Sequence, residues 1–521
     1  MPIDGATLAG PAGPLPDLLR SGLEADPDAV ALASTERAVT WSEADEARRR
    51  LVGGYAALGL GPGDRLASLM PNRIDLAIHY LACFTLGLVA TPLNYRYTAR
   101  EIDHALEVSG ASALVVHAER AGDVAASRLA GRLPLGTVWY EGSGGDGPRL
   151  EALADAAPAD APSPEPSAPA AIFFTSGSTG PSKGVTHTGE TLGWMVASAA
   201  GGFELTAADV FLPGSSMSHL GSFLWTFAAL SSGARVAVAR GYDADELLPL
   251  LRAQRPSVMA MIPAALGALL RDPRARPDDF ASLRVCRAGA DKVALQLEDD
   301  FVRLAGFPID EGYGMTEVGI ATLNPPSGVI KRGSIGRPVP GFAVAIRDDD
   351  GAEVPPGTVG RIWLRTRSRT VGYWGDPAAS AAIAPDGWLD SGDLGRADGD
   401  GYLWFFGRRK QLIVHDGSNI SPLEVEEALT EHPRVAIAAA VGVDDAMHGE
   451  NVRAYVTLAG DGPPPGAELI AFARERIGYK APEEVVVLDE MPLNPTGKVD
   501  RAGLRRLAEE HLHPHGVDGP R

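Results

Sequence analysis

Residues 173–185 read FFTSGSTGPSKGV, and this stretch decides how the rest of the chain is interpreted. Two phenylalanines end a short apolar run of strand length, and the next residues are mostly Gly, Ser and Thr, with Lys183 among them. Such a loop offers backbone N–H groups, hydroxyls, little bulk and one positive charge, which suits a phosphate chain. It is not a Walker A loop, where Gly and Lys are adjacent, because Pro181 and Ser182 separate Gly180 from Lys183. A plain surface loop is the alternative interpretation.

The composition indicates an acidic globular protein with more than one domain. The 521 residues are 45% hydrophobic and 22% charged, and a chain of this length exceeds a single hydrophobic core. A net charge of −20 without a basic stripe argues against nucleic-acid binding. With only two cysteines and no secretory pattern at the N-terminus, a cytoplasmic location is expected. The most apolar window, residues 76–90, is too short to span a membrane and predicts a buried helix.

Lysine is rare in this chain, which makes each lysine informative. Only six of the 47 basic residues are lysines, and the remainder are arginines. Because the two side chains differ in size, geometry and hydration, a retained lysine indicates that a compact ammonium group is needed. The six are Lys183, Lys292, Lys331, Lys410, Lys480 and Lys498, and chance remains an explanation for Lys292 and Lys331.

The middle of the chain alternates between strand and helix patterns. RVAVA (235–239), SVMAMIP (257–263) and LRVCRAG (283–289) are apolar runs of strand length, and the first two flank a predicted helix that starts at Asp243. Alternation of this kind predicts parallel sheets with helices on their faces. The predicted fold class is therefore α/β, with a large N-terminal domain of mostly parallel sheets flanked by helices.

The last 110 or so residues have a different pattern, typical of a small α+β domain. QLIVH (411–415), VAIAAAVGV (435–443), VRAYVTL (452–458) and EVVVL (484–488) are strand-like. The segment SPLEVEEALTEH predicts a helix with Ser421 as its cap, Pro422 in its first turn and Glu424 closing a capping box.

Four further stretches accompany the glycine-rich loop in a fixed order. They are EGYGMTE (311–317), GWLDSGDLG (387–395), GRRKQLIVHDG (407–417) and PLNPTGKVDR (492–501). At these residues the chain resembles the adenylate-forming (ANL) superfamily of acyl-CoA synthetases, stand-alone adenylation domains and beetle luciferases. The resemblance extends over nearly the whole chain, from PLNYRYTAREI (92–102) to the last motif.

The resemblance implies a fold, a reaction and a set of ligands. It implies a large N-terminal domain over residues 1–408 and a small mobile C-terminal domain over residues 409–521, joined by a hinge. It implies that a carboxylate attacks the α-phosphate of ATP, with Mg²⁺ bound, to give an acyl-adenylate and pyrophosphate. The thiol of coenzyme A then displaces AMP, so the chain is expected to be an acid–thiol ligase.

The resemblance also implies roles for individual residues in adenylation. Lys498 resembles the catalytic lysine that bridges carboxylate and α-phosphate, and Glu317 resembles the magnesium ligand, a suitable role for a carboxylate. The residues implied in holding phosphates are Thr316, Thr175, Ser176, Gly177, Ser178, Thr179, Gly180 and Lys183.

Nucleoside recognition and domain alternation are implied by other matches. Those implied in binding the nucleoside are Asp393 and Arg408 at the ribose, Tyr313 at the adenine, and Gly289, Ala290, Gly312 and Gly314 where backbone approaches the base. Lys410 matches the hinge position, and Gly417 matches the glycine that lines the pantetheine tunnel. Asp416 stands where the family often has another glycine, which changes the charge beside that tunnel.

The acyl site is implied by PGSSMSHLGSFLW (213–225). His219 aligns with the gate beside the acyl carboxylate. Leu220 stands where amino-acid-activating domains usually carry an aspartate, so an ordinary α-amino acid is not the expected substrate. The residues expected to line an apolar acyl pocket are Met217, Leu220, Gly221, Phe223, Met315 and Val318.

The leading prediction is an acyl-CoA synthetase for an apolar, non-amino carboxylic acid. The alternatives are a ligase that loads a carrier-protein phosphopantetheine arm, and a relative that performs one half-reaction, such as CoA transfer from a preformed acyl-adenylate. Oxidative luciferase chemistry shares the adenylation step. A non-catalytic nucleotide-binding protein is disfavoured because Glu317, Asp393 and Lys498 are all retained. The sequence does not identify the acid.

Overall fold

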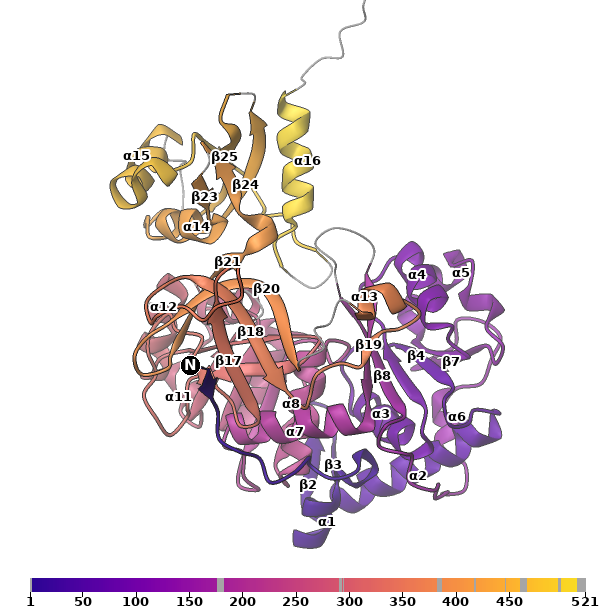
Figure 1. The fold of residues 1–521 in the computed structure, drawn as a ribbon. Coiled ribbons are helices and arrows are strands. Elements are labelled where there is room, and N and C mark those ends of the chain that lie inside the picture. The colour runs from indigo at the N-terminus through magenta and orange to yellow at the C-terminus, as the bar shows by residue number, and fades with distance from the viewer. Residues whose placement is uncertain are drawn as a thin grey trace, which may run out of the picture. The chain divides into compact units, whose positions relative to one another are not determined.

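The computed structural model describes residues 2–175, 182–289, 293, 295–381, 387–416, 418–445, 447–459, 466–494 and 498–512. The chain divides into two compact units, which are described separately (Figure 1). Unit 1 comprises residues 1–290, 301–344 and 363–389, and unit 2 comprises residues 291–300, 345–362 and 390–521. The predicted domain boundary between residues 408 and 409 marks the expected hinge, whereas the two units are defined by how the chain packs. The boundary therefore remains a prediction.

Unit 1 contains a nine-stranded sheet with the order β16-β15-β14-β13-β12-β10-β11-β2-β3. Its strands are β2 (Val30–Ala33), β3 (Ala38–Thr40), β10 (Val210–Gly214), β11 (Arg235–Ala237), β12 (Val258–Met261), β13 (Val285–Ala288), β14 (Asp310–Met315), β15 (Gly319–Leu323) and β16 (Arg337–Pro338). The six strands from β2 to β14 in this order are parallel, while β3, β15 and β16 pair antiparallel with their neighbours. The prediction of mostly parallel sheets is confirmed here.

A seven-stranded sheet in unit 1 has the order β19-β9-β8-β5-β4-β6-β7. Its strands are β4 (Arg65–Leu69), β5 (Val89–Pro92), β6 (Ala113–His117), β7 (Thr137–Tyr140), β8 (Pro169–Thr175), β9 (Lys183–Thr188) and β19 (Gly372–Tyr373). Strands β8, β5, β4, β6 and β7 are parallel, whereas β9 pairs antiparallel with both β8 and β19. The two strands that flank the glycine-rich loop in the sequence, β8 and β9, are therefore paired neighbours in this sheet.

Helices accompany the strands of these sheets along the chain. The helices are α1 (Arg20–Ala25), α2 (Trp41–Ala57), α3 (Ile74–Leu86), α4 (Ala99–Ser109), α5 (Ala121–Ala126), α6 (Leu150–Ala154), α7 (Gly189–Gly202), α8 (Leu220–Ser231), α9 (Ala244–Gln254), α10 (Pro263–Arg271), α11 (Pro277–Phe280), α12 (Leu295–Ala305) and α13 (Pro377–Ala381). As predicted, Asp243 caps α9, accepting a hydrogen bond from the Glu246 backbone N–H. The predicted buried helix is α3. It ends where Gly87 adopts the left-handed conformation, and the last residues of the apolar window 76–90 belong to the start of β5.

Aromatic side chains join the seven-stranded sheet to the helices of unit 1. The ring of Phe223 on α8 has its centroid 4.9 Å from that of Phe173 on β8 and 5.0 Å from that of Tyr80 on α3. Phe84 and Phe227 complete this cluster. All five side chains are buried, and edge-to-face ring pairs stabilise such a core beyond the burial of area. This packing fixes the strand that leads into the glycine-rich loop.

A five-stranded sheet has the order β1-β17-β18-β20-β21. Its strands are β1 (Ile3–Asp4), β17 (Phe342–Arg347), β18 (Gly360–Thr366), β20 (Trp388–Ala397) and β21 (Leu403–Arg408). The boundaries between the two units fall within β17, β18 and β20. Strands β20 and β21 are antiparallel, and Asp393 is the register partner of Arg408.

The C-terminal part of unit 2 is a small α+β fold, as predicted. Its sheet has the order β23-β22-β25-β24, with β26 added parallel to β25. The elements are β22 (Ile413–His415), β23 (Ser418–Ile420), α14 (Pro422–Thr430), β24 (Val435–Asp445), β25 (Gly449–Leu458), α15 (Gly466–Ile477), β26 (Glu484–Val487) and α16 (Arg501–Leu512). Apolar clusters on both faces of β24 and β25 give this part its own core.

The capping box predicted for α14 is wrong. Ser421 does precede Pro422 at the start of the helix, but its hydroxyl makes no capping bond and donates instead to the carbonyl of Phe406, 2.6 Å away. Glu424 accepts hydrogen bonds from the Lys480 ammonium at 2.6 and 2.9 Å. Both side chains therefore have partners distant in sequence, which compete successfully with the local cap.

Within the part of the chain that the structure describes, no helix combines the length and the apolar character that a membrane crossing requires.

Candidate active site

The β8–β9 hairpin positions the ends of the glycine-rich loop. Thr175, the last residue of β8, is the antiparallel partner of Lys183, the first residue of β9. The predicted phosphate-binding residues Ser176, Gly177, Ser178, Thr179 and Gly180 lie outside the described residues. What the structure shows is that the loop leaves and re-enters the sheet at neighbouring positions.

Lys183 lies beside an aromatic ring and a carboxylate of unit 1. Its ammonium nitrogen is 3.4 Å from Asp376 Oδ2 and 5.2 Å from the centroid of the Tyr373 ring. About half of the lysine side chain is exposed. A cation over a ring face is attracted by the ring quadrupole, so the ammonium has a defined place while remaining accessible to a ligand.

Tyr373 also contacts Glu317, the predicted magnesium ligand. The tyrosine hydroxyl donates a hydrogen bond to Glu317 Oε1 at 2.9 Å. Burial and, in addition, the Glu317 carboxylate raise the pKa of Tyr373 well above its usual value, so the hydroxyl keeps its proton. One ring therefore connects the lysine and the buried carboxylate. The sequence analysis assigned no role to Tyr373. Its position between Gly372 and Trp374 was the only local feature that could have drawn attention to it.

Backbone hydrogen bonds fix the Thr316–Glu317 segment from two sides. The imidazole Nε2 of His187 donates to the Thr316 carbonyl at 2.9 Å, and the Thr370 N–H donates to the Glu317 carbonyl at 2.7 Å. The Thr370 hydroxyl donates to the Thr186 carbonyl at 2.6 Å. Burial lowers the pKa of His187 to about 4, only partly offset by the bond to Thr316, so this histidine is neutral at pH 7.

Close packing around the glycines predicted at the nucleoside site leaves little room for a side chain, apart from any role in binding. A Cβ on Gly312 would lie 2.8 Å from the Thr322 carbonyl oxygen, and a Cβ on Gly314 would lie 2.3 Å from that of Gly319. A Cβ on Gly289 would meet the Arg287 guanidinium at 3.0 Å. At Gly312 and Gly314 in β14 the contact is with backbone, so only glycine fits there with or without a nucleotide, whereas at Gly289 the flexible Arg287 side chain could move aside. Tyr313 is buried between the two glycines of β14, while Ala290 lies outside the described residues.

His219 is fixed by an asparagine that sequence reasoning did not assign a role. His219 precedes α8, and its Nε2 lies 3.3 Å from the amide nitrogen of Asn94. The Asn94 amide oxygen accepts from the Arg96 N–H at 2.9 Å. Since an amide nitrogen only donates, His219 Nε2 is the acceptor. The segment PLNYRY (92–97) was the signal that could have identified Asn94.

The predicted acyl-pocket residues surround the start of α8 and the β14–β15 turn. Met217, Leu220, Phe223 and Val318 are buried, whereas Met315 is partly exposed. A Cβ on Gly221 would lie 3.3 Å from the Trp225 ring. Phe223 belongs to the aromatic cluster and has a clear packing role. The lining of an acyl pocket by these residues remains a prediction.

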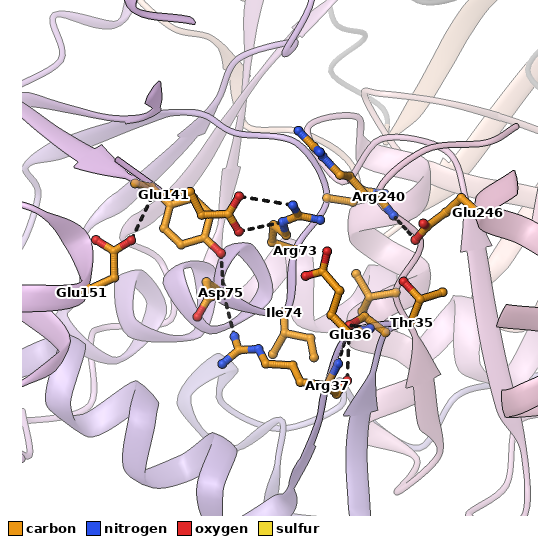
Figure 2. Close-up of a pocket in the computed structure, with 14 residues that line it drawn as sticks. Thr35, Glu36, Arg37, Arg73, Ile74, Asp75, Glu141, Glu151, Arg240 and Glu246 are labelled. Carbon is orange, nitrogen blue, oxygen red and sulfur yellow. Dashed lines mark hydrogen bonds and ion pairs between the residues drawn. The ribbon is translucent and has the colours of Figure 1, made fainter. Parts of the chain in front are cut away.

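A separate cavity of about 310 Å³ in unit 1 contains none of the predicted site residues. Figure 2 shows that charged side chains face one another across it. Arg37 pairs with Asp75 at 2.6 Å and Arg73 with Glu141 at 3.0 Å, and the Tyr140 hydroxyl donates to Asp75 at 2.6 Å. A cavity of this kind does not suit an apolar acyl chain.

Unit 2 brings together the two residues predicted at the ribose. Asp393 is buried, and its Oδ1 lies 3.6 Å from the Arg408 Nε on the neighbouring strand. The Asp393 N–H donates to the Ser391 hydroxyl at 3.1 Å, and that hydroxyl donates to the Ile362 carbonyl at 2.7 Å. Asp393 and Arg408 are thus neighbours on paired strands, and their role at the ribose remains a prediction.

The two functional lysines predicted in unit 2 lie in short irregular segments. Lys410 is exposed in the single turn η4 (Arg409–Gln411), which follows β21. The N–H of Lys498 donates to Asn494 Oδ1 at 3.1 Å, and the Asn494 N–H donates to the Lys498 carbonyl at 2.7 Å. Gly417, predicted at the pantetheine tunnel, lies outside the described residues.

Comparisons with known proteins identify the family of this chain. The family model "AMP-binding enzyme" matches residues 19–374, and "AMP-binding enzyme C-terminal domain" matches residues 424–498. The chain therefore belongs to the AMP-binding enzyme family, the adenylate-forming superfamily that its motifs resemble.

Individual relatives cover almost the whole chain. It is 34% identical over 489 residues to a feruloyl-CoA synthase of Amycolatopsis sp, covering 92% of this chain and 96% of the relative. It is 33% identical over 500 residues to the indoleacetate–CoA ligase of Aromatoleum aromaticum, covering 94% and 96%. The fold matches ATP-bound MatB from Rhodopseudomonas palustris with a TM-score of 0.88 at 27% identity, covering 96% of this chain and 99% of that one. The chain is thus an enzyme of the acid–thiol ligase class, an acyl-CoA synthetase.

Proposed function

We propose that this acyl-CoA synthetase activates an apolar carboxylic acid without an α-amino group. A carboxylate oxygen of the acid attacks the α-phosphorus of ATP, forming a mixed anhydride and releasing pyrophosphate. The sulfur of coenzyme A then attacks the acyl carbon, and AMP leaves. The observation that carries this proposal is the placement of Lys183, Tyr373 and Glu317 in contact at the base of the glycine-rich hairpin.

The residues of unit 1 fit ATP with Mg²⁺. Glu317 is a buried carboxylate oriented by the Tyr373 hydroxyl, and a carboxylate held by an outer partner is a suitable magnesium ligand. Bound Mg²⁺ would neutralise charge on the polyphosphate. The Lys183 ammonium, together with the hydroxyls of Thr175 and Thr316, would bind phosphate oxygens, and Lys183 would exchange its contact with Asp376 for them.

Unit 2 contributes the remaining proposed roles. Lys498 would stabilise the charge that develops when carboxylate and α-phosphate meet. Asp393 would accept hydrogen bonds from the ribose hydroxyls, with Arg408 beside it. Lys410 would be the hinge that separates residues 1–408 from 409–521, and Gly417 would line the pantetheine tunnel.

The acid that we propose is aryl-substituted or otherwise apolar. Leu220 places a buried apolar side chain where an α-ammonium group would need a carboxylate, and His219 is oriented by Asn94 beside it. The two relatives named above are a feruloyl-CoA synthase and an indoleacetate–CoA ligase, and both of those acids carry aromatic rings. Aryl acids are therefore the first class to test.

Two alternatives remain within the same chemistry. The thiol could belong to a carrier-protein phosphopantetheine arm, or the enzyme could perform only one half-reaction. Location in the cytoplasm is part of the proposal, because Cys83 and Cys286 are both free and buried, as suits a reducing compartment.

A panel of carboxylic acids, with mass spectrometry of CoA adducts, tests the proposal beside a pyrophosphate assay without CoA. We expect acid-dependent pyrophosphate release for aryl or other apolar acids, and formation of the corresponding acyl-CoA with AMP. Pyrophosphate release without a CoA adduct, together with acylation of a phosphopantetheinylated carrier protein, would identify the carrier-protein alternative. Turnover of α-amino acids alone would contradict the proposed substrate class.

A further inference from the structure

Two histidines and two carboxylates lie together in the C-terminal sheet of unit 2. His415 is the last residue of β22, Asp416 follows it, and His448 lies in the loop between β24 and β25. One ligand atom from each of these three residues lies within 4.8 Å of the others. Glu483, just before β26, brings its Oε1 within 3.6 Å of His415 Nε2.

The hydrogen bond of His415 determines which of its nitrogens can bind a ligand. His415 Nδ1 is 2.8 Å from the carbonyl oxygen of Glu450, and because a carbonyl only accepts, Nδ1 carries the hydrogen. In the neutral imidazole the lone pair is therefore on Nε2. That nitrogen is 3.7 Å from Asp416 Oδ2 and 3.6 Å from Glu483 Oε1. A positive centre, either a proton or a metal ion, would relieve the repulsion between this lone pair and the two carboxylates.

His448 and Asp416 are held by the backbone as well as by each other. Asp416 has a φ of 49°, and its N–H donates to the His448 carbonyl at 2.9 Å. His448 Nδ1 is 2.9 Å from Asp416 Oδ1, and the rings of His415 and His448 stack with centroids 5.1 Å apart. The N–H of His448 is anchored to Asp445 Oδ1 at 2.9 Å. The two imidazoles are thus placed before any ligand arrives.

The two carboxylate distances from His415 Nε2 are those of ligands that share one metal ion, whereas His448 Nδ1 makes a direct hydrogen bond to Asp416 and leaves its Nε2 as the nitrogen for a metal. Separations of 3.6 and 3.7 Å exceed the range of N–H···O bonds. Two ligands about 2.1 Å from a tetrahedral Zn²⁺ are about 3.4 Å apart. A histidine whose other nitrogen donates to a backbone carbonyl is the usual arrangement at such a site.

We propose that His415, Asp416 and His448 form a binding site for Zn²⁺ on unit 2, with the Glu483 carboxylate beside His415. Two imidazoles and a carboxylate suit this borderline cation, whereas Mg²⁺ and Ca²⁺ prefer oxygen ligands alone. Asp416 and His448 are 59% and 37% exposed, so the ion has a path from solvent, and His415 is largely covered. The Glu483 carboxylate is oriented by the Val452 N–H, which donates to its Oε2 at 2.6 Å. Asp416 is next to Gly417, which we predict at the pantetheine tunnel, so the test below measures metal binding itself and does not depend on acyl-CoA formation.

Equilibrium dialysis of the tag-free full chain against Zn²⁺, in millimolar Mg²⁺ and with metal analysis, tests the proposal. We expect one Zn²⁺ per chain, and a loss of affinity of at least about 10-fold for His415→Ala and for His448→Ala. Glu483→Gln should lower the affinity less. Glu484→Gln is the matched control, since that neighbouring carboxylate pairs with Arg453 at 2.6 Å instead, and it should leave the affinity unchanged.

Cobalt provides a readout on the wild-type chain that does not depend on folding of the variants. Co²⁺ added to the full chain should give intense visible absorption bands typical of tetrahedral coordination, and Zn²⁺ should displace them. The site does not exist if the wild type binds no stoichiometric Zn²⁺ in Mg²⁺. It is equally excluded if a folded double variant, His415→Ala with His448→Ala, binds Zn²⁺ and Co²⁺ as the wild type does.

Discussion

Lys183 of unit 1 and Lys498 of unit 2 are held in different ways. Lys183 begins a strand that is paired on both sides, and its ammonium lies over the ring of Tyr373, whose hydroxyl contacts the buried Glu317. Lys498 lies in an irregular segment whose main chain is joined to Asn494 by two hydrogen bonds. The residues that we propose to hold the phosphates are therefore part of a packed network, whereas the main chain of Lys498 is fixed locally.

Because of this difference, substitutions in the two regions should affect the reaction and the folding free energy differently. A change within the unit 1 network should alter both the reaction and the folding free energy, because buried hydrogen bonds are shared between the site and the sheet. A change at Lys498 should alter the reaction alone, since partly exposed side chains outside the core contribute little to folding. The following substitutions test that distinction.

Lys498→Ala should have the largest effect. Removal of an aligned charge should lower acid-dependent pyrophosphate release by about 10²–10³-fold, with the free energy of unfolding unchanged within about 0.5 kcal/mol. CoA transfer from a synthetic acyl-adenylate should be retained. Lys480→Ala, which removes a lysine paired with Glu424, is the control and should release pyrophosphate normally. Equal loss of both half-reactions would contradict the role given to Lys498.

His187 should make the stability of unit 1 depend on pH. Its pKa is lowered to about 4 from 6.5 by burial, so the unfolded chain binds a proton between these values and the folded chain does not. The stabilisation is present above pH 6.5 and is lost as the pH falls through 4, by about 3 kcal/mol. Denaturant unfolding across this range should show a shallower slope for His187→Gln, whose amide can still donate to Thr316. An unchanged slope would show that His187 is not buried as a neutral group.

Asp393→Ala should raise the apparent KM for ATP. A carboxylate that accepts hydrogen bonds from a ligand contributes about 1.5–3 kcal/mol, so steady-state kinetics should show an increase of about 10- to 100-fold. Asp390→Ala is the control on the same strand, because Asp390 pairs with Arg361 at 2.9 Å. If the KM stays at the wild-type value, Asp393 has no part in the ribose site.

Tyr373→Phe should have the smallest effect, on both chemistry and stability. Loss of one hydrogen bond to Glu317 should lower kcat/KM and the apparent Mg²⁺ affinity by about 2- to 10-fold. Tyr140→Phe removes a similar tyrosine–carboxylate bond, to Asp75 at the cavity in Figure 2, and should change stability but not kinetics. Identical kinetics for Tyr373→Phe and wild type would remove Tyr373 from the site.

Patterns confined to neighbouring residues predicted the fold well. The helix that starts at Asp243 and the buried helix α3 both follow from local signals, namely a capping side chain and an apolar run ended by Gly87. The capping box at Ser421 failed because Phe406 and Lys480 offered better partners. Periodicity and capping rules describe only the residues within a turn or two.

For the candidate site, a motif can name a residue in the sequence but cannot name a partner that is distant along the chain. Glu317 and Asp393 follow from their motifs, and the structure gives each a buried position. Tyr373 is separated from Glu317 by 56 residues, and Asn94 from His219 by 125. Both contacts arise from pairing and packing of separate strands and helices, which one unaligned sequence does not encode in any local pattern.

Exchange of radiolabelled pyrophosphate into ATP tests the central claim most directly. The wild-type chain, with Mg²⁺ and an aryl acid but without CoA, should exchange label into ATP only when the acid is present, because adenylation is reversible and precedes thiol attack. Addition of CoA should then yield acyl-CoA and AMP in equal amounts. If no acid supports exchange, or if phosphate and ADP appear in place of pyrophosphate and AMP, the chain does not form an acyl-adenylate.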